Sequence, residues 1–133
     1  MAGQLTIDTL SASSGVLATQ NGMTGIAKAW VNFNGNTATI RGSFNVGSIT
    51  RVAQGVYTIA FSTAMPNANY VVNVNASPDN GSTFYPCYTP CMYSTDRSTL
   101  NATPTTSGFG FYITWSTAAY PDPTYTSVAV FSA

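Results

Sequence analysis

The stretch AKAWVNFNGNTATIRGSFNV, residues 27–46, decides the fold that we expect for this chain. Its first eight residues alternate between apolar and polar side chains, which is typical of a strand with one buried face. Residues 34–36 (Asn-Gly-Asn) predict a hairpin turn, because Asn and Gly tolerate the positive φ that tight turns require. Residues 38–46 alternate again, and we expect one face of this returning strand to carry Ile40, Phe44 and Val46.

The same two-residue alternation recurs along the rest of the chain, and no segment has helical periodicity. We expect further strands at 55–62, 70–76, 108–116 and 125–132, and weaker ones at 4–9 and 98–103. Residues 83–94 contain two prolines, which cannot donate to a sheet ladder, so this segment is an edge strand, a bulged strand or a loop. The predicted fold class is all-β: an antiparallel, jelly-roll-like β-sandwich of about eight or nine short strands.

The length of 133 residues fits one domain. We expect the sandwich to occupy residues 26–133 and residues 1–25 to form an extended N-terminal assembly arm, because 10–25 are small, Ser/Gly-rich and weakly patterned. Such an arm is expected to dock on a neighbouring chain. The apolar side chains that would be buried there are Leu5, Ile7, Leu10, Val16 and Leu17.

Charged side chains are scarce. They make up 6% of the residues, against roughly 25% in ordinary soluble domains, and the net charge is zero. Proteins that stay monomeric usually keep a net charge away from zero. The composition therefore predicts association with copies of the same chain or with a larger body.

The sequence gives no sign of a membrane or nucleic-acid partner. No apolar run approaches the roughly 20 residues that span a bilayer. The opening MAGQLTIDTL lacks a basic stretch followed by an apolar one, so we expect no signal peptide. Four scattered basic residues cannot form a stripe that follows a phosphate backbone.

Catalysis is difficult to build from these residues. The chain contains neither His nor Glu, and its four Asp residues lie far apart beside turn-forming neighbours. A glycosidase needs two carboxylates beside one sugar bond, and a Cys nucleophile needs a base. We therefore expect no enzyme and no cofactor.

Cys87 and Cys91 leave three interpretations open. Two reduced thiols are favoured for a protein made in a cytosol. A local disulfide is the second interpretation, because turns could bring the two Cα atoms into range. A metal site is the least favoured, since two thiols cannot fill a tetrahedral shell.

Aromatic residues are dense in residues 83–97 and recur in the proline-rich connection 117–124. Tyrosine presents a ring and a hydroxyl at low entropic cost, which suits a contact surface, and such rings beside Asn and Asp could hold a sugar of a cell-surface glycan. The alternative is packing beneath the loop or against a sister subunit. The candidate receptor-contact residues are Phe84, Tyr85, Tyr88, Tyr93, Asp96, Arg97, Tyr120 and Asp122.

Residues 25–72 resemble a module common in tailed-bacteriophage virion proteins, often described as tail-fibre or phage structural proteins. The matching parts are KAWVNFNG (28–35), IRGSFNVGSIT (40–50), GVYTIAFSTAMPNANY (55–70) and SVAVFS (127–132). The second half of the chain is similar only in pattern. The aromatic residues of the motif are expected to serve core packing and cross-strand contact: Trp30, Phe33, Phe44, Tyr57, Phe61 and Tyr70.

One segment departs from the family pattern. Residues 51–54 (Arg-Val-Ala-Gln) stand where the family commonly has an acidic or Gly-rich turn. Such a change leaves the fold intact and concerns the surface that the turn presents.

The resemblance implies a virion protein, assembled in the host cytoplasm, that acts through its surfaces. One expected role is the head of a homotrimeric fibre or spike that contacts the host cell surface, where the receptor is either a glycan or a protein. The other is a capsid decoration (cement) protein that stabilises the phage head. Both roles predict cyclic oligomers and contact with other virion proteins.

Overall fold

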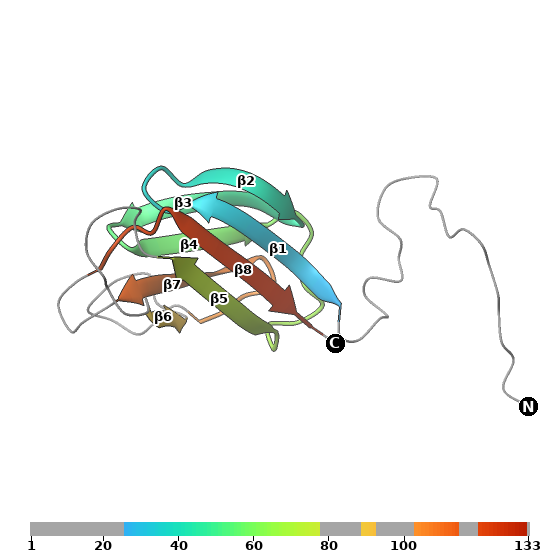
Figure 1. Cartoon of the computed structure of the whole chain (residues 1–133). Helices are drawn as coiled ribbons and strands as arrows, with labels where there is room; N and C mark the ends of the chain where they lie inside the picture. Colours follow the sequence, from blue (N-terminus) through green and yellow to red (C-terminus); the bar gives the residue numbers. More distant parts are fainter. Residues whose placement is uncertain (1–25, 78–88, 93–102, 115–119, 133) are drawn as a thin grey trace, which may run out of the picture.

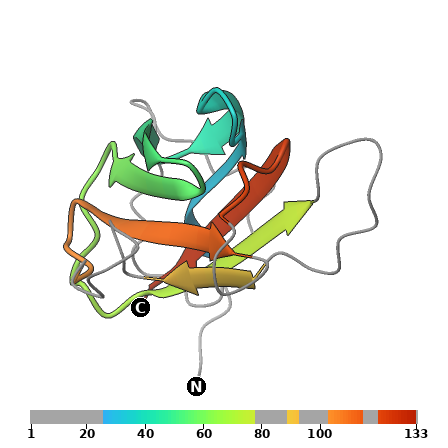
Figure 2. The same ribbon diagram turned by 90° about the vertical axis from the view of Figure 1, so that its left-hand side faces the viewer.

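The computed structural model describes residues 26–77, 89–92, 103–114 and 120–132, and these form two four-stranded antiparallel sheets packed face to face (Figure 1). Sheet A has the order β2-β1-β8-β5 and sheet B the order β3-β4-β7-β6. In the view turned by 90°, β8 and β5 lie in one layer and β7 and β6 in the other (Figure 2). The strands are β1 (Ala27–Asn34), β2 (Thr39–Phe44), β3 (Val46–Ala53), β4 (Val56–Phe61), β5 (Val71–Ser77), β6 (Thr89–Met92), β7 (Gly108–Thr114) and β8 (Tyr125–Phe131).

The expected antiparallel β-sandwich is confirmed, and the part of the chain that the structure describes contains no helix. The jelly-roll-like winding stays a prediction. The proposed arm, residues 1–25, lies outside the described residues, as do the weak strand at 4–9 and most of the one at 98–103.

The predicted hairpin joins β1 to β2. The side chain of Asn34 begins the turn, because its Oδ1 accepts the backbone N–H of Asn36 at 2.9 Å. Ala38 closes the turn with φ of 55°, a left-handed conformation that alanine seldom adopts. The hairpin therefore forms with a small backbone cost at its last residue.

The expectation that Ile40, Phe44 and Val46 share one face is wrong. A bulge interrupts the β1–β2 ladder, so that Phe33 pairs with Ile40 but Asn32 pairs with Gly42. The extra residue is Arg41, and it reverses the alternation: Ile40 packs against the core, whereas Phe44 lies opposite the exposed Trp30.

Asn45 carries the chain from sheet A to sheet B. Its backbone has φ of 53°, and its amide nitrogen donates to the backbone oxygens of Lys28 and Thr63, both at 3.1 Å. The amide oxygen accepts the N–H of Thr63 at 2.7 Å. Asn is suited to this corner because it tolerates a left-handed conformation and bonds backbone groups on both sides.

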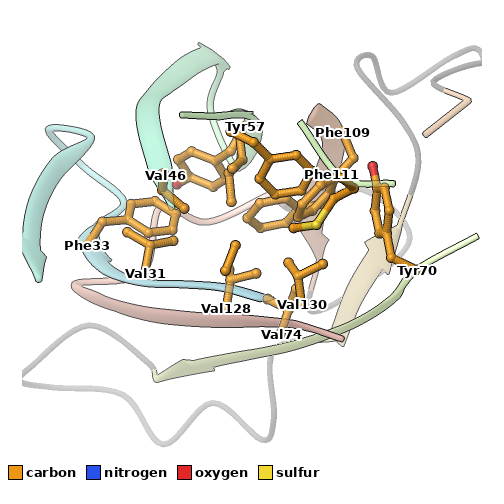
Figure 3. Packing of buried hydrophobic residues seen from close by; sticks show 14 of the residues in the cluster. Val31, Phe33, Val46, Tyr57, Tyr70, Val74, Phe109, Phe111, Val128 and Val130 are labelled. Atoms are coloured by element: carbon orange, nitrogen blue, oxygen red, sulfur yellow. The ribbon is translucent and has the colours of Figure 1, made fainter. Parts of the chain in front are cut away.

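The core lies between the sheets and is built from both aliphatic and aromatic side chains (Figure 3). Sheet A contributes valines such as Val31, Val128 and Val130, and sheet B contributes Tyr57 and Phe111. Aromatic rings meet edge to face or tilted across the layer, which is their favoured arrangement. The further core residues include Ala29, Phe33, Val46, Ile59, Phe61, Met65, Tyr70, Val74, Phe109 and Ile113.

The predicted aromatic packing is confirmed for the residues at the centre of the sandwich, Phe33, Tyr57, Phe61 and Tyr70. Trp30 is not in the core: its side chain lies on the opposite face of β1, is 44% exposed, and has Phe44 of β2 as its cross-strand neighbour. The segment with two prolines contributes β6, which lies at the edge of sheet B with Pro90 opposite Ile113. The edge-strand interpretation is thus the correct one for residues 89–92.

Candidate functional site

The most densely bonded polar group in the described structure is the carboxylate of Asp122. The Arg51 guanidinium donates two hydrogen bonds to this carboxylate: Nε donates to Oδ1 at 3.0 Å, and a terminal nitrogen donates to Oδ2 at 2.5 Å. The backbone N–H of Gly55 and the hydroxyl of Tyr57 also donate to Oδ1, at 2.7 Å and 2.6 Å. We call these four residues the Asp122 junction.

The junction fastens the connection that leads from β7 in sheet B to β8 in sheet A. Asp122 binds the β3–β4 hairpin, and the oxygen of the next residue, Pro123, accepts the N–H of Gly35 in the β1–β2 turn at 2.8 Å. There is no room for a side chain at Gly35, since a Cβ would lie 2.6 Å from both the Pro123 oxygen and the Tyr57 hydroxyl. Three connections from the two sheets are therefore locked together at one end of the sandwich.

The junction fixes the protonation states of its members. Burial opposes the charge on Asp122, but hydrogen bonds from Arg51, Tyr57 and Gly55 outweigh it and hold the pKa of the carboxyl below its usual range. Burial, reinforced by the hydrogen bond to Asp122, raises the pKa of Tyr57 far above its usual value. The hydrogen bond to Asp122 also raises the pKa of Arg51. Across the neutral range the junction is a fixed ion pair with a neutral phenol.

Such a group holds the fold together and has no proton to exchange near neutral pH. One oxygen of Asp122 already accepts three hydrogen bonds, and its side chain is only 9% exposed. The receptor-contact role expected of Asp122 stays a prediction, although its carboxylate is mostly buried and is hydrogen-bonded to residues of the same chain. Tyr120, two residues earlier, is half-buried and meets the ring of Tyr112 edge to face at 5.8 Å.

Most of the other expected site residues fall outside the described residues. Cys91 lies in β6, opposite Tyr112 of β7, whereas Cys87 is not described. The expected receptor contacts that lie outside are Phe84, Tyr85, Tyr88, Tyr93, Asp96 and Arg97, and the expected arm contacts are Leu5, Ile7, Leu10, Val16 and Leu17.

A second feature, not expected from the sequence, is the outward side of sheet A, which we call the outer face. Two large rings stand exposed on it, Trp30 of β1 at 44% and Tyr125 of β8 at 54%. They point to the same side, because Trp30 pairs with Ala129 and Tyr125 is four residues from Ala129 on the same strand. That spacing separates the Cα positions of the two residues by about 13 Å along the strand direction.

Short polar side chains occupy the space between the two rings. The amide nitrogen of Asn32 donates to the Ser127 hydroxyl at 2.8 Å, directly across the β1–β8 ladder. On the neighbouring strand Asn75 lies opposite Ser127, and its amide nitrogen donates to Asn73 at 3.1 Å. The middle of the outer face is therefore a row of linked amides and a hydroxyl.

Both rings are held in place by residues of β2. The six-membered ring of the Trp30 indole lies above Gly42, 3.5 Å from where a Cβ would stand. The guanidinium carbon of Arg41 lies 4.3 Å from the centre of the Tyr125 ring, which is a cation–π contact. The bulge that displaces Arg41 from the ladder therefore also contributes to the arrangement of the outer face.

The sequence contained a partial signal for this surface. The alternation of β1 assigns Trp30 and Asn32 to the polar side, away from the core. Their partners on β8 could not be inferred, because β8, which pairs with β1 on the side away from β2, comes from the far end of the chain.

Within the described ranges, no three His, Cys, Asp or Glu side chains gather as metal ligands would. Those ranges also hold no helix with the length and hydropathy to cross a membrane. Comparison with protein-family models, with curated proteins and with solved structures finds no match for the chain.

Proposed function

We propose that the chain is a non-enzymatic bacteriophage virion surface protein, the head of a homotrimeric fibre or spike that contacts the host cell. The resemblance of residues 25–72 to phage structural modules supports the virion setting. The observation that carries the proposal is the outer face of sheet A, where Trp30 and Tyr125 stand exposed beside an array of uncharged polar groups.

The composition of the described surface supports a role in contact. Five large apolar side chains are between 41% and 67% exposed on a chain of zero net charge. These side chains are available for contact, and a neutral chain has little electrostatic repulsion to keep its copies apart. These five side chains are Ile26, Trp30, Val52, Val71 and Tyr125.

A capsid decoration protein is the second candidate. The Ser/Gly-rich composition of residues 1–25 favours it, because an arm that docks on a neighbouring subunit suits a protein that clamps a shell. Both candidates would be assembled in the host cytoplasm. Both also include a jelly-roll-like winding of about eight or nine strands, and an experimental structure of the full chain would test that winding.

The location of the protein on the particle separates the two candidates. Cryo-electron microscopy of the phage that encodes the chain should show a few copies on the tail. Hundreds of copies on the head would replace the fibre proposal with the decoration proposal, and absence from the particle would end both. Light scattering on the purified chain tests the trimer, and a monomer of 14.0 kDa at high concentration would contradict it.

A further inference from the structure

We infer that the outer face of sheet A is a binding platform for an uncharged oligosaccharide, with Trp30 and Tyr125 as its two stacking rings. The inference deepens the proposed function, since it names the class of ligand that the host-contacting surface would take. It also places the site on a sheet face, away from the loops in which the sequence had suggested receptor contacts.

The two rings provide the stacking part of such a site. A pyranose ring has apolar C–H faces, and exposed indole and phenol rings are the side chains that cover them at the lowest conformational cost. The indole of Trp30 packs over the backbone of Gly42, and the guanidinium of Arg41 packs against the ring of Tyr125. Both rings are thus arranged before a ligand arrives, which lowers the entropy lost on binding.

The row between the rings provides the hydrogen bonds. A sugar presents hydroxyl groups, which both donate and accept, and side-chain amides offer both functions in the same way. Asn32 uses one amide N–H on Ser127, and Asn75 uses one on Asn73, so each amide retains further capacity toward solvent. Because the two ring-bearing residues are about 13 Å apart along the strand direction, with this row between them, the platform suits an oligosaccharide better than a single sugar.

Charged groups are scarce on the platform, so it is poorly suited to a ligand held mainly by ionic contacts. The four strands of sheet A contain no Asp or Glu, and their two basic residues are Lys28 and Arg41. Lys28 is only 4% exposed, and Arg41 is engaged by the Tyr125 ring. A ligand that relies on ionic contacts finds few on this face, whereas a neutral glycan needs none.

A glycan microarray that carries both neutral and acidic oligosaccharides, probed with the full chain, tests the inference. We expect binding to neutral oligosaccharides and a loss of affinity of at least about tenfold in Trp30→Ala and in Tyr125→Ala. Val52→Ala is the matched control, because Val52 is equally exposed but lies on β3 of the other sheet, and it should bind as the unmodified chain does. Thermal unfolding establishes that each variant is folded.

Three outcomes would overturn the inference: no binding to any neutral glycan, binding confined to acidic glycans, or unchanged binding in both ring variants. A change in oligomer mass in folded Trp30→Ala would instead identify the outer face as a contact between copies of the chain. None of these results bears on the location of the protein on the particle. The proposed function is therefore tested separately and does not fail with this inference.

Discussion

The Tyr57 hydroxyl donates to Asp122 at 2.6 Å and thereby ties the start of β4 to the connection that enters β8. The tyrosine ring belongs to the core, while its hydroxyl reaches the Asp122 junction. The Tyr57 side chain therefore connects the apolar core to the Asp122 junction at the end of the sandwich. Several properties of the protein should depend on this contact.

Asp122→Asn should lower the free energy of unfolding by about 2–3 kcal/mol, because it removes charge-assisted bonds at a mostly buried carboxylate. Urea unfolding measures the change. Tyr57→Phe supplies the second arm of a double-mutant cycle, since it deletes only the hydroxyl that Asp122 accepts. The two changes should be coupled by at least about 0.5 kcal/mol, and strictly additive effects would show that the Tyr57 hydroxyl gains nothing from the charge of Asp122.

The junction should make stability depend on pH at both extremes. The pKa of Asp122 is depressed in the folded state, so its stabilisation is complete above the usual carboxyl pKa and disappears as the pH falls through the folded value. The pKa of Tyr57 is raised, so its contribution is complete below about pH 10, the usual phenol value, and declines as the pH rises beyond it. When the free energy of unfolding is measured from acid to alkaline pH, its decrease at acid pH should disappear in Asp122→Asn. Its decrease at alkaline pH should become smaller in Tyr57→Phe. Profiles identical to that of the unmodified chain would contradict this assignment.

Gly35→Ala should destabilise the protein by about 2–3 kcal/mol, because the new methyl group would collide with the backbone oxygen of Pro123 and the hydroxyl of Tyr57. Gly42→Ala is the matched control in the same hairpin. A Cβ there meets nothing closer than the Trp30 ring at 3.5 Å, so stability should change by less than about 0.5 kcal/mol. Equal losses in the two variants, measured by thermal unfolding, would be inconsistent with the close approach at Gly35.

Thr126→Val should stabilise the protein by about 1 kcal/mol. Thr126 is fully buried on the core side of β8, and its hydroxyl finds no hydrogen-bond partner in the described part of the chain. Valine has the same shape and removes the buried polar group. Thr58→Val, at a half-buried position of β4, serves as the control and should change stability by less than about 0.5 kcal/mol. A loss of stability in Thr126→Val would mean that the hydroxyl is hydrogen-bonded after all.

Strand periodicity was enough to predict the sandwich, because burial of one face leaves a direct trace in the sequence. Tyr57, Ile59 and Phe61 alternate along β4 and are all buried, as the pattern indicated. The same rule failed in β2, where the bulge at Arg41 turned Phe44 to the outer face. A bulge inserts one residue without changing the composition of the strand, so the pattern alone could not locate it.

The two polar features were harder to predict for a different reason. The Asp122 junction joins residues as much as 71 positions apart, and the outer face depends on β8 lying between β1 and β5. The Pro-Asp-Pro sequence at 121–123 indicated a turn but could not identify Arg51 or Tyr57 as the partners. Contacts of this kind follow from the order of strands in the sheets, which local periodicity does not encode.

Competition for host adsorption tests the central claim most directly. Purified full chain is added to host cells before the phage that encodes it, and free phage is counted after adsorption. We expect the chain to reduce adsorption in a dose-dependent manner. Folded Trp30→Ala should be weaker by at least about tenfold, whereas Val52→Ala should be as effective as the unmodified chain. Adsorption that stays unchanged at saturating concentrations of the folded chain would contradict the claim that this protein contacts the host.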